Sequence, residues 1–160
     1  MSNQISLPYP DTDGIIRAPG FIGDVSSARM AELGDISDYV YYSLMLEECF
    51  PVLSELFEKI ATTEMRHFLL LGKMTIRLGG DPALRTRHTT PFYGRPERID
   101  GKMAEKMITS AIDGEQAAVK RYLCLARAMC ADKAAVALLE RIAADEEHHA
   151  RMLSRAICEL

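Results

Sequence analysis

A chain of 160 residues is long enough for one domain with a single substantial core. The formal net charge of −4 and the pI near 5.6 disfavour binding to a phosphate backbone, so we expect no nucleic-acid partner. No apolar stretch is long enough to cross a bilayer, and no basic segment followed by an apolar run begins the sequence, so we expect a cytoplasmic protein without membrane contact.

The first half of the chain predicts an irregular arm followed by two helices. Residues 1–24 are rich in proline, glycine and aspartate and have no helical period, so we assign them to the arm. Ser26 or Ser27 can cap a first helix that ends near Glu48. Proline is tolerated in the first turn of a helix, which places a second helix at residues 51–78.

The second half predicts two further helices after a long connection. Gly79 stops the second helix, and residues 80–99 contain three prolines and no period. Asp100 is a natural cap for a third helix, which runs to about Met129. Asp132 can cap a fourth helix that continues almost to the last residue.

The lengths of these connections predict the topology. Two short turns make each pair of neighbouring helices an antiparallel hairpin. A 28-residue helix is roughly 42 Å long, and twenty extended residues reach roughly 65 Å, so residues 80–99 can cross the whole bundle. We therefore predict an all-α fold in which residues 25–160 form a four-helix bundle of two hairpins joined by a long crossover.

A repeated pattern of metal-binding residue types links the two predicted hairpins. In each half, a glutamate is followed seven positions later by a tyrosine, and the next helix carries a Glu-x-x-His pair on one face. Corresponding residues of the two halves are 83 positions apart on the first helix and 82 on the second. The two sets are Glu32, Tyr39, Glu64 and His67, and Glu115, Tyr122, Glu146 and His149.

These residue types suit a site for two metal ions. Two adjacent ions need several anionic oxygens, and one histidine for each ion adds a nitrogen ligand. The alternative places all of these side chains on solvated helix faces. Glu64 and His67 share a helix stripe with Ile60, Leu71 and Met74, which should form the core, so the pattern favours the metal site.

At these residues the sequence resembles the ferritin-like superfamily, especially bacterioferritins and rubrerythrins. Glu32-Leu33 with Ile36 and Tyr39 resembles their E-L-x-x-I-x-x-Y segment, and residues 64–67 and 145–149 resemble their E-M-x-H and D-E-E-x-H segments. The resemblance covers residues 25–79 and 101–158. It implies two bridging carboxylates, two terminal carboxylates and two histidines as metal ligands: Glu64 and Glu146, Glu32 and Glu115, and His67 and His149.

The same resemblance limits what can be transferred. We expect no counterpart of the fifth helix of cage ferritins or of the rubredoxin-like segment of many rubrerythrins. Met65 stands where bacterioferritins carry a haem-ligating methionine, but a single methionine discriminates poorly and we expect no haem. Asp35 stands where the families have a small or apolar residue, either beside the ligands or exposed. We expect His148 to be solvated, because it lies about 100° around the helix from His149.

Three functional classes compete for such a site. The resemblance favours a non-haem di-metal oxidoreductase that reduces peroxide or dioxygen and receives electrons from a separate donor protein. Iron oxidation and storage is the second class, and a di-manganese catalase-like or spore-coat-like protein is the third. A structural bundle without metal remains as well. Iron is the expected metal and manganese the alternative, because carboxylate–imidazole sites accept both. Tyr39 and Tyr122 are assigned a catalytic role, because their hydroxyls can donate hydrogen bonds into the space between the ions.

Two further expectations concern surfaces and thiols. The first two helices carry more large apolar residues than one inward stripe needs, so we expect a homodimer or a larger homo-oligomer built along them. The cysteines form no C-x-x-C pair, and we predict that all four are buried, reduced thiols: Cys49, Cys124, Cys130 and Cys158.

Overall fold

Four long helices account for most of the computed structural model, which describes residues 8–84 and 99–159. A 3-10 turn, η1 (Pro19–Phe21), precedes α1 (Ile22–Leu46), and α2 (Pro51–Leu78) follows after a tight turn. The second half contains α3 (Gly101–Ala128) and α4 (Lys133–Ile157). Neither described stretch contains a β-strand. The predicted all-α bundle of four helices is therefore confirmed.

Local chemistry explains most of the helix boundaries. The side chain of Asp100 accepts a hydrogen bond from the backbone of Met103, and Asp132 accepts two from the first turn of α4. Gly79 ends α2 with φ of 97°, in the left-handed region that favours glycine. The caps and the stop predicted from the sequence are confirmed at these three positions.

The predicted start of the first helix is wrong. Helix α1 begins at Ile22, so Ser26 and Ser27 lie within it and cap nothing. Its lead-in is the η1 turn, in which Pro19 fixes the backbone and its carbonyl accepts the N–H of Ile22. A backbone turn therefore starts the helix where we expected a serine side chain.

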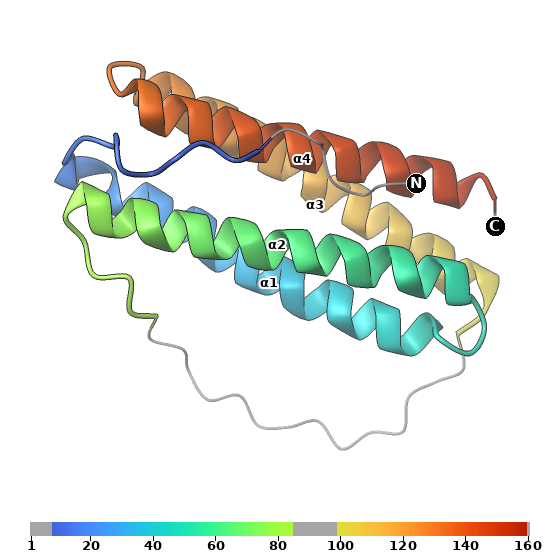
Figure 1. The fold of residues 1–160 in the computed structure, drawn as a ribbon. Coiled ribbons are helices and arrows are strands. Elements are labelled where there is room, and N and C mark those ends of the chain that lie inside the picture. Colours follow the sequence, from blue (N-terminus) through green and yellow to red (C-terminus); the bar gives the residue numbers. More distant parts are fainter. Residues whose placement is uncertain (1–7, 85–98, 160) are drawn as a thin grey trace.

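The helices pack as two antiparallel hairpins, α1 with α2 and α3 with α4 (Figure 1). The last turn of α2 and the first turn of α3 lie at opposite ends of the bundle, as a long crossover requires. Residues 85–98 of the predicted crossover lie outside the described residues.

Two apolar clusters fill the bundle, one toward each end. One contains Val25, Leu71 and Leu139, and the other contains Phe57, Ile108 and Leu153. Every helix contributes residues to both clusters, and a segment near its middle belongs to neither cluster. The ligand candidates identified from the sequence fall in these middle stretches.

The prediction of buried thiols is wrong, because all four cysteines are exposed. Cys49, Cys130 and Cys158 lie in turns just after helix ends, and Cys124 lies on an outer face of α3. No helix in the described parts of the chain is both long enough and apolar enough to cross a membrane.

Exposed apolar side chains gather on one hairpin. Of the ten large apolar residues that are exposed in the described part of the chain, one lies on α3, one in the N-terminal arm and eight on α1 and α2. Val40, Leu44 and Met65 line a groove of about 380 Å³ between α1 and α2. We propose that this face is buried between two copies of the chain, because a monomer seldom leaves such a patch in water.

Sedimentation velocity at micromolar concentration tests this proposal. We expect the parent protein to sediment as a dimer or larger, and Leu44→Glu to shift it to the monomer because a charge would enter an apolar contact. Leu123→Glu is the matched control, since Leu123 is an exposed leucine of α3. A monomeric parent protein would refute the proposal.

Candidate metal centre

Six ionisable side chains meet in the middle of the bundle, between the two apolar clusters. All four helices contribute: one glutamate each from α1 and α3, and a glutamate with a histidine three residues later from α2 and from α4. None of the six is more than 3% exposed. They are Glu32, Glu64, His67, Glu115, Glu146 and His149.

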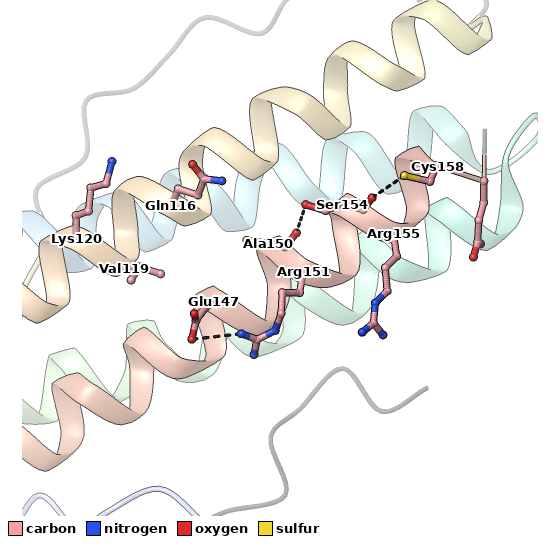
Figure 2. A pocket seen from close by; sticks show the side chains of 10 residues that line it. Gln116, Val119, Lys120, Glu147, Ala150, Arg151, Ser154, Arg155 and Cys158 are labelled. Atoms are coloured by element: carbon pink, nitrogen blue, oxygen red, sulfur yellow. Dashed lines mark hydrogen bonds and ion pairs between the residues drawn. The ribbon is translucent and has the colours of Figure 1, made fainter.

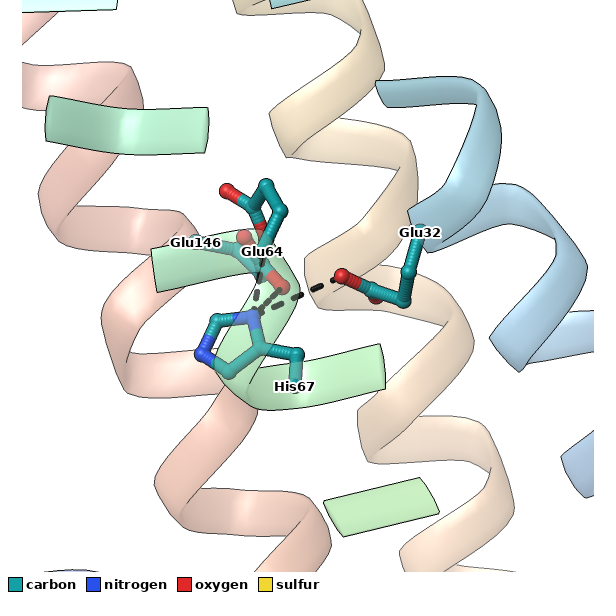
Figure 3. Close-up of side chains that lie close together, drawn as sticks. All are labelled: Glu32, Glu64, His67 and Glu146. Atoms are coloured by element: carbon teal, nitrogen blue, oxygen red, sulfur yellow. Dashed lines mark hydrogen bonds and ion pairs between the residues drawn. The ribbon is translucent and has the colours of Figure 1, made fainter. Parts of the chain in front are cut away.

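Four of these residues form a group around His67 (Figure 3). The Nδ1 atom of His67 lies 2.8 Å from Glu64 Oε2, 3.1 Å from Glu146 Oε1 and 3.5 Å from Glu32 Oε2. One ligand atom from each residue lies within 4.8 Å of the others. This group, the His67 position, could hold one metal ion.

A second group of the same kind surrounds His149. Its Nδ1 atom lies 2.9 Å from Glu64 Oε1, 3.4 Å from Glu146 Oε2 and 3.5 Å from Glu115 Oε2. Glu64 and Glu146 thus turn one oxygen toward each histidine, as carboxylates that bridge two ions must do. The structure brings together all six residues that the sequence singled out, and we call the second group the His149 position.

The two predicted tyrosines hold the outer carboxylates across the bundle. Tyr39 of α1 donates a hydrogen bond to Glu115 of α3 at 2.5 Å, and Tyr122 of α3 donates one to Glu32 of α1. Each tyrosine therefore donates its hydrogen bond to a glutamate of the opposite hairpin. The sequence placed the hydroxyls toward the space between the ions, whereas in the structure both are engaged by carboxylates.

Three residues without a predicted role form a cluster next to His67, in which Asp145 and Tyr9 contact the histidine and Arg141 contacts Asp145. Asp145 Oδ2 lies 3.1 Å from His67 Nε2 and 2.6 Å from Arg141 Nη1, and it accepts a hydrogen bond from the hydroxyl of Tyr9 at 2.6 Å. Burial alone would raise the pKa of Asp145, but these partners hold it down at about 2. Asp145 belongs to the D-E-E-x-H segment, whereas no sequence signal marks Tyr9.

The neighbouring polar residues lie outside both groups. Asp35 is half-buried on α1, where burial and the charges of Glu64 and Glu146 raise its pKa to about 6. Neither group includes His148. The side chain of Glu147 forms an ion pair with Arg151 at 3.3 Å in a groove on the outer face of α3 and α4 (Figure 2). Glu147 thus points outward, although its neighbour Glu146 points into the bundle.

The sequence of this chain matches a known family of proteins over most of its length. The model of the ferritin-like domain matches residues 32–160, which is most of the chain. The chain belongs to the ferritin-like family. No curated protein matches this ferritin-like chain.

The charges of the metal-free site are already balanced. Burial raises the pKa of Glu32 to about 8 and raises that of Glu115 well above its usual range, which favours the neutral acid in both. Burial lowers the pKa of His67 and His149, but the carboxylates of Glu64 and Glu146 outweigh it and raise both values well above the usual range. The two imidazolium ions therefore face two carboxylates.

A pair of divalent ions fits the same six residues in this ferritin-like site. Buried oxygens of Glu32, Glu64 and Glu146 accept no hydrogen bond of good geometry among the described residues, although each lies within 3.5 Å of a histidine Nδ1 atom, so they are available as ligands once the histidines lose their protons. Two divalent ions would balance four ionised glutamates, with both histidines neutral. Because the charge stays the same, binding amounts to an exchange of two ions for the protons that the site holds.

This exchange predicts proton release at acidic pH. At pH 6.5 both histidines and Glu32 carry protons in the metal-free protein, because their pKa values are raised, and the raised pKa of Glu115 favours its neutral acid. Binding of two Mn²⁺ ions should therefore release at least about three protons, and the affinity should rise with pH as the protons leave. Calorimetric titration in two buffers with different protonation enthalpies measures the release. Binding without proton release at pH 6.5 would contradict this account of the site.

Proposed function

We propose that this ferritin-like protein is a non-haem di-metal oxidoreductase that reduces peroxide, with two iron ions as its cofactor and manganese as the alternative. The observation that carries the proposal is that Glu64 and Glu146 each face both histidines with separate oxygens. Two metal positions that share two carboxylates are close enough to act on one small molecule.

The surroundings of the site favour a small oxidant. All six ligand candidates are buried between two apolar clusters, so peroxide or dioxygen fits better than an organic substrate. One terminal glutamate, one histidine and two shared carboxylates would leave about two positions of an octahedral shell open at each ion. When bound, two adjacent redox metals supply the electron pair that peroxide reduction needs.

The residues of the chain have separate tasks in this reaction. Glu64 and Glu146 hold the two positions together, and the histidines supply one nitrogen ligand to each. Tyr39 and Tyr122 fix the outer carboxylates through hydrogen bonds, which limits their rearrangement. Reduction of one peroxide to two water molecules consumes two electrons and two protons. The electrons come from a separate donor protein, since the chain carries no C-x-x-C pair.

Iron oxidation and storage is the main competing function. The exposed apolar face of α1 and α2 favours it, because storage requires assembly of many copies. A catalase-like reaction of two manganese ions uses a similar site, but manganese catalases, which the sequence resembles more distantly, typically use five protein ligands, and six candidates are present here. These functions differ in which oxidant reacts and in how much iron is retained.

Stopped-flow oxidation of the protein loaded with two Fe²⁺ ions tests the proposed reaction. We expect peroxide to react much faster than dioxygen. Glu64→Ala and Glu146→Ala should slow the peroxide reaction by at least about 100-fold, because loss of a shared ligand costs no less than loss of a residue that supports a ligand. Glu147→Ala is the matched control, since Glu147 lies next to Glu146 but is exposed.

Three other experimental outcomes would contradict the proposed peroxide reduction at this site. Faster reaction with dioxygen and retention of hundreds of irons per assembly would indicate storage. Manganese in the purified protein with release of dioxygen from peroxide would indicate a catalase. If both glutamate variants react like the parent protein, the chemistry does not take place at this site.

A further inference from the structure

The described part of the N-terminal arm, which begins at residue 8, packs against the bundle between α2 and α4 (Figure 1). Thr12 and Ile15 are each only 6% exposed, and Ile15 belongs to one of the two apolar clusters. The backbone N–H of Ile16 donates to Asp132 Oδ2 at 2.7 Å, and Asp13 forms an ion pair with Arg77 of α2. These contacts hold the arm in place independently of the metal positions.

The arm brings Tyr9 to the outer side of His67. The Tyr9 hydroxyl donates to Asp145 at 2.6 Å and lies 3.3 Å from His67 Nε2. The guanidinium carbon of Arg141 lies 4.4 Å from the centre of the Tyr9 ring, and Arg141 also pairs with Asp145 at 2.6 Å. Asp145 is therefore fixed from three sides, with its carboxylate directed at the nitrogen of His67 that faces away from the metal position.

The His149 position lacks the equivalent support. The residue 82 positions before Asp145, which corresponds to it in the first hairpin, is Thr63. Its hydroxyl donates to the carbonyl of Lys59 at 3.4 Å, within its own helix. The Nε2 atom of His149 is buried and finds no hydrogen-bond partner among residues 8–84 and 99–159. The symmetry of the six ligand candidates thus does not extend to the residues that support the two histidines.

We propose that Tyr9, acting through Asp145, orients His67 and makes the His67 position the tighter of the two metal positions. This inference rests on the proposed metal site. A carboxylate that accepts the outer N–H of a ligating histidine fixes the tautomer and orientation of the ring and raises its basicity. The His149 ring has no such acceptor in the described structure, so more of its order must come from the metal.

Thermodynamic linkage gives the arm a second observable. If docking of Tyr9 strengthens metal binding at His67, then metal binding must strengthen docking of the arm by the same factor. The amide of Ile16 reports on docking, because its N–H donates to Asp132 only when the arm lies in place. We therefore expect metal to slow hydrogen exchange of this amide by about tenfold, the factor that supporting residues commonly contribute.

Stepwise Mn²⁺ titration, followed by electron paramagnetic resonance and calorimetry, tests the proposal. The parent protein should bind two ions with different affinities. Tyr9→Phe, which removes only the hydroxyl, should weaken the tighter step by about tenfold and leave the other step unchanged. Asp145→Asn should weaken the same step by about 10–100-fold. Tyr41→Phe is the matched control, since it removes the same hydroxyl group from an exposed tyrosine of α1 that belongs to neither metal position.

The outcomes separate this inference from the proposed site. If Tyr9→Phe leaves both Mn²⁺-binding steps unchanged, or weakens both equally, Tyr9 does not have the proposed role, although the metal site itself stands. Equal exchange of Ile16 with and without Mn²⁺ would overturn that role as well. If the parent protein binds no Mn²⁺, the metal site itself is wrong and this inference ends with it. The inference is supported if Tyr9→Phe weakens only the tighter Mn²⁺-binding step and if Mn²⁺ no longer slows hydrogen exchange of the Ile16 amide in this variant.

Discussion

Six ionisable side chains in the dry middle of a helical bundle impose the constraint on which the rest of the structure depends. Burial of isolated charges is very costly, so the site must be neutral as a whole in every state that is populated. Two imidazolium ions against two carboxylates, with Glu32 and Glu115 protonated, satisfy this condition without metal. Two divalent ions with four ionised glutamates satisfy it with metal.

The architecture follows from that condition. Each helix contributes ligand candidates at its middle, and apolar clusters on both sides keep water away. The hydrogen bonds of Tyr39 and Tyr122 cross from one hairpin to the other, so the polar middle also joins the two hairpins. Loss of Glu64 or Glu146 would leave an imidazolium ion without its partner, and the stability of the bundle and the binding of metal are therefore coupled.

The two halves of the chain repeat the ligand pattern but differ in what surrounds it. Asp145 of α4 supports His67 of α2. The residue of α2 that corresponds to Asp145 is Thr63, whose hydroxyl donates to a carbonyl of its own helix and does not support His149. Asp35 lies close to the site, and the residue 83 positions later is the buried Ala118. The exposed apolar residues lie almost entirely on the first hairpin. A symmetric ligand set thus sits in asymmetric surroundings, which allows its two positions to differ in affinity.

The sequence predicted those features that depend on spacing along one helix. The bounds of α2, the caps at Asp100 and Asp132 and the convergence of the six ligand candidates follow from helical period and local hydrogen bonding. Contacts between segments were not predictable in this way. A seven-residue spacing places Tyr39 on the face of Glu32, but it does not show that the hydroxyl reaches Glu115.

Segments without a period gave the least information. The arm that carries Tyr9 has no repeat from which its contact with Asp145 could be inferred. Ser26 was a plausible cap, but the turn at Pro19 begins the helix earlier. The cysteines were expected to be buried because small thiols usually are, whereas three of the four follow helix ends, where the chain is exposed.

Anomalous diffraction from crystals grown with Mn²⁺ tests the central claim most directly. We expect two anomalous peaks roughly 3.5–4 Å apart, each near one histidine nitrogen and each contacted by both Glu64 and Glu146. A single peak, peaks on the outer surface of the bundle, or no peak among the six residues would contradict the account of a shared two-metal site.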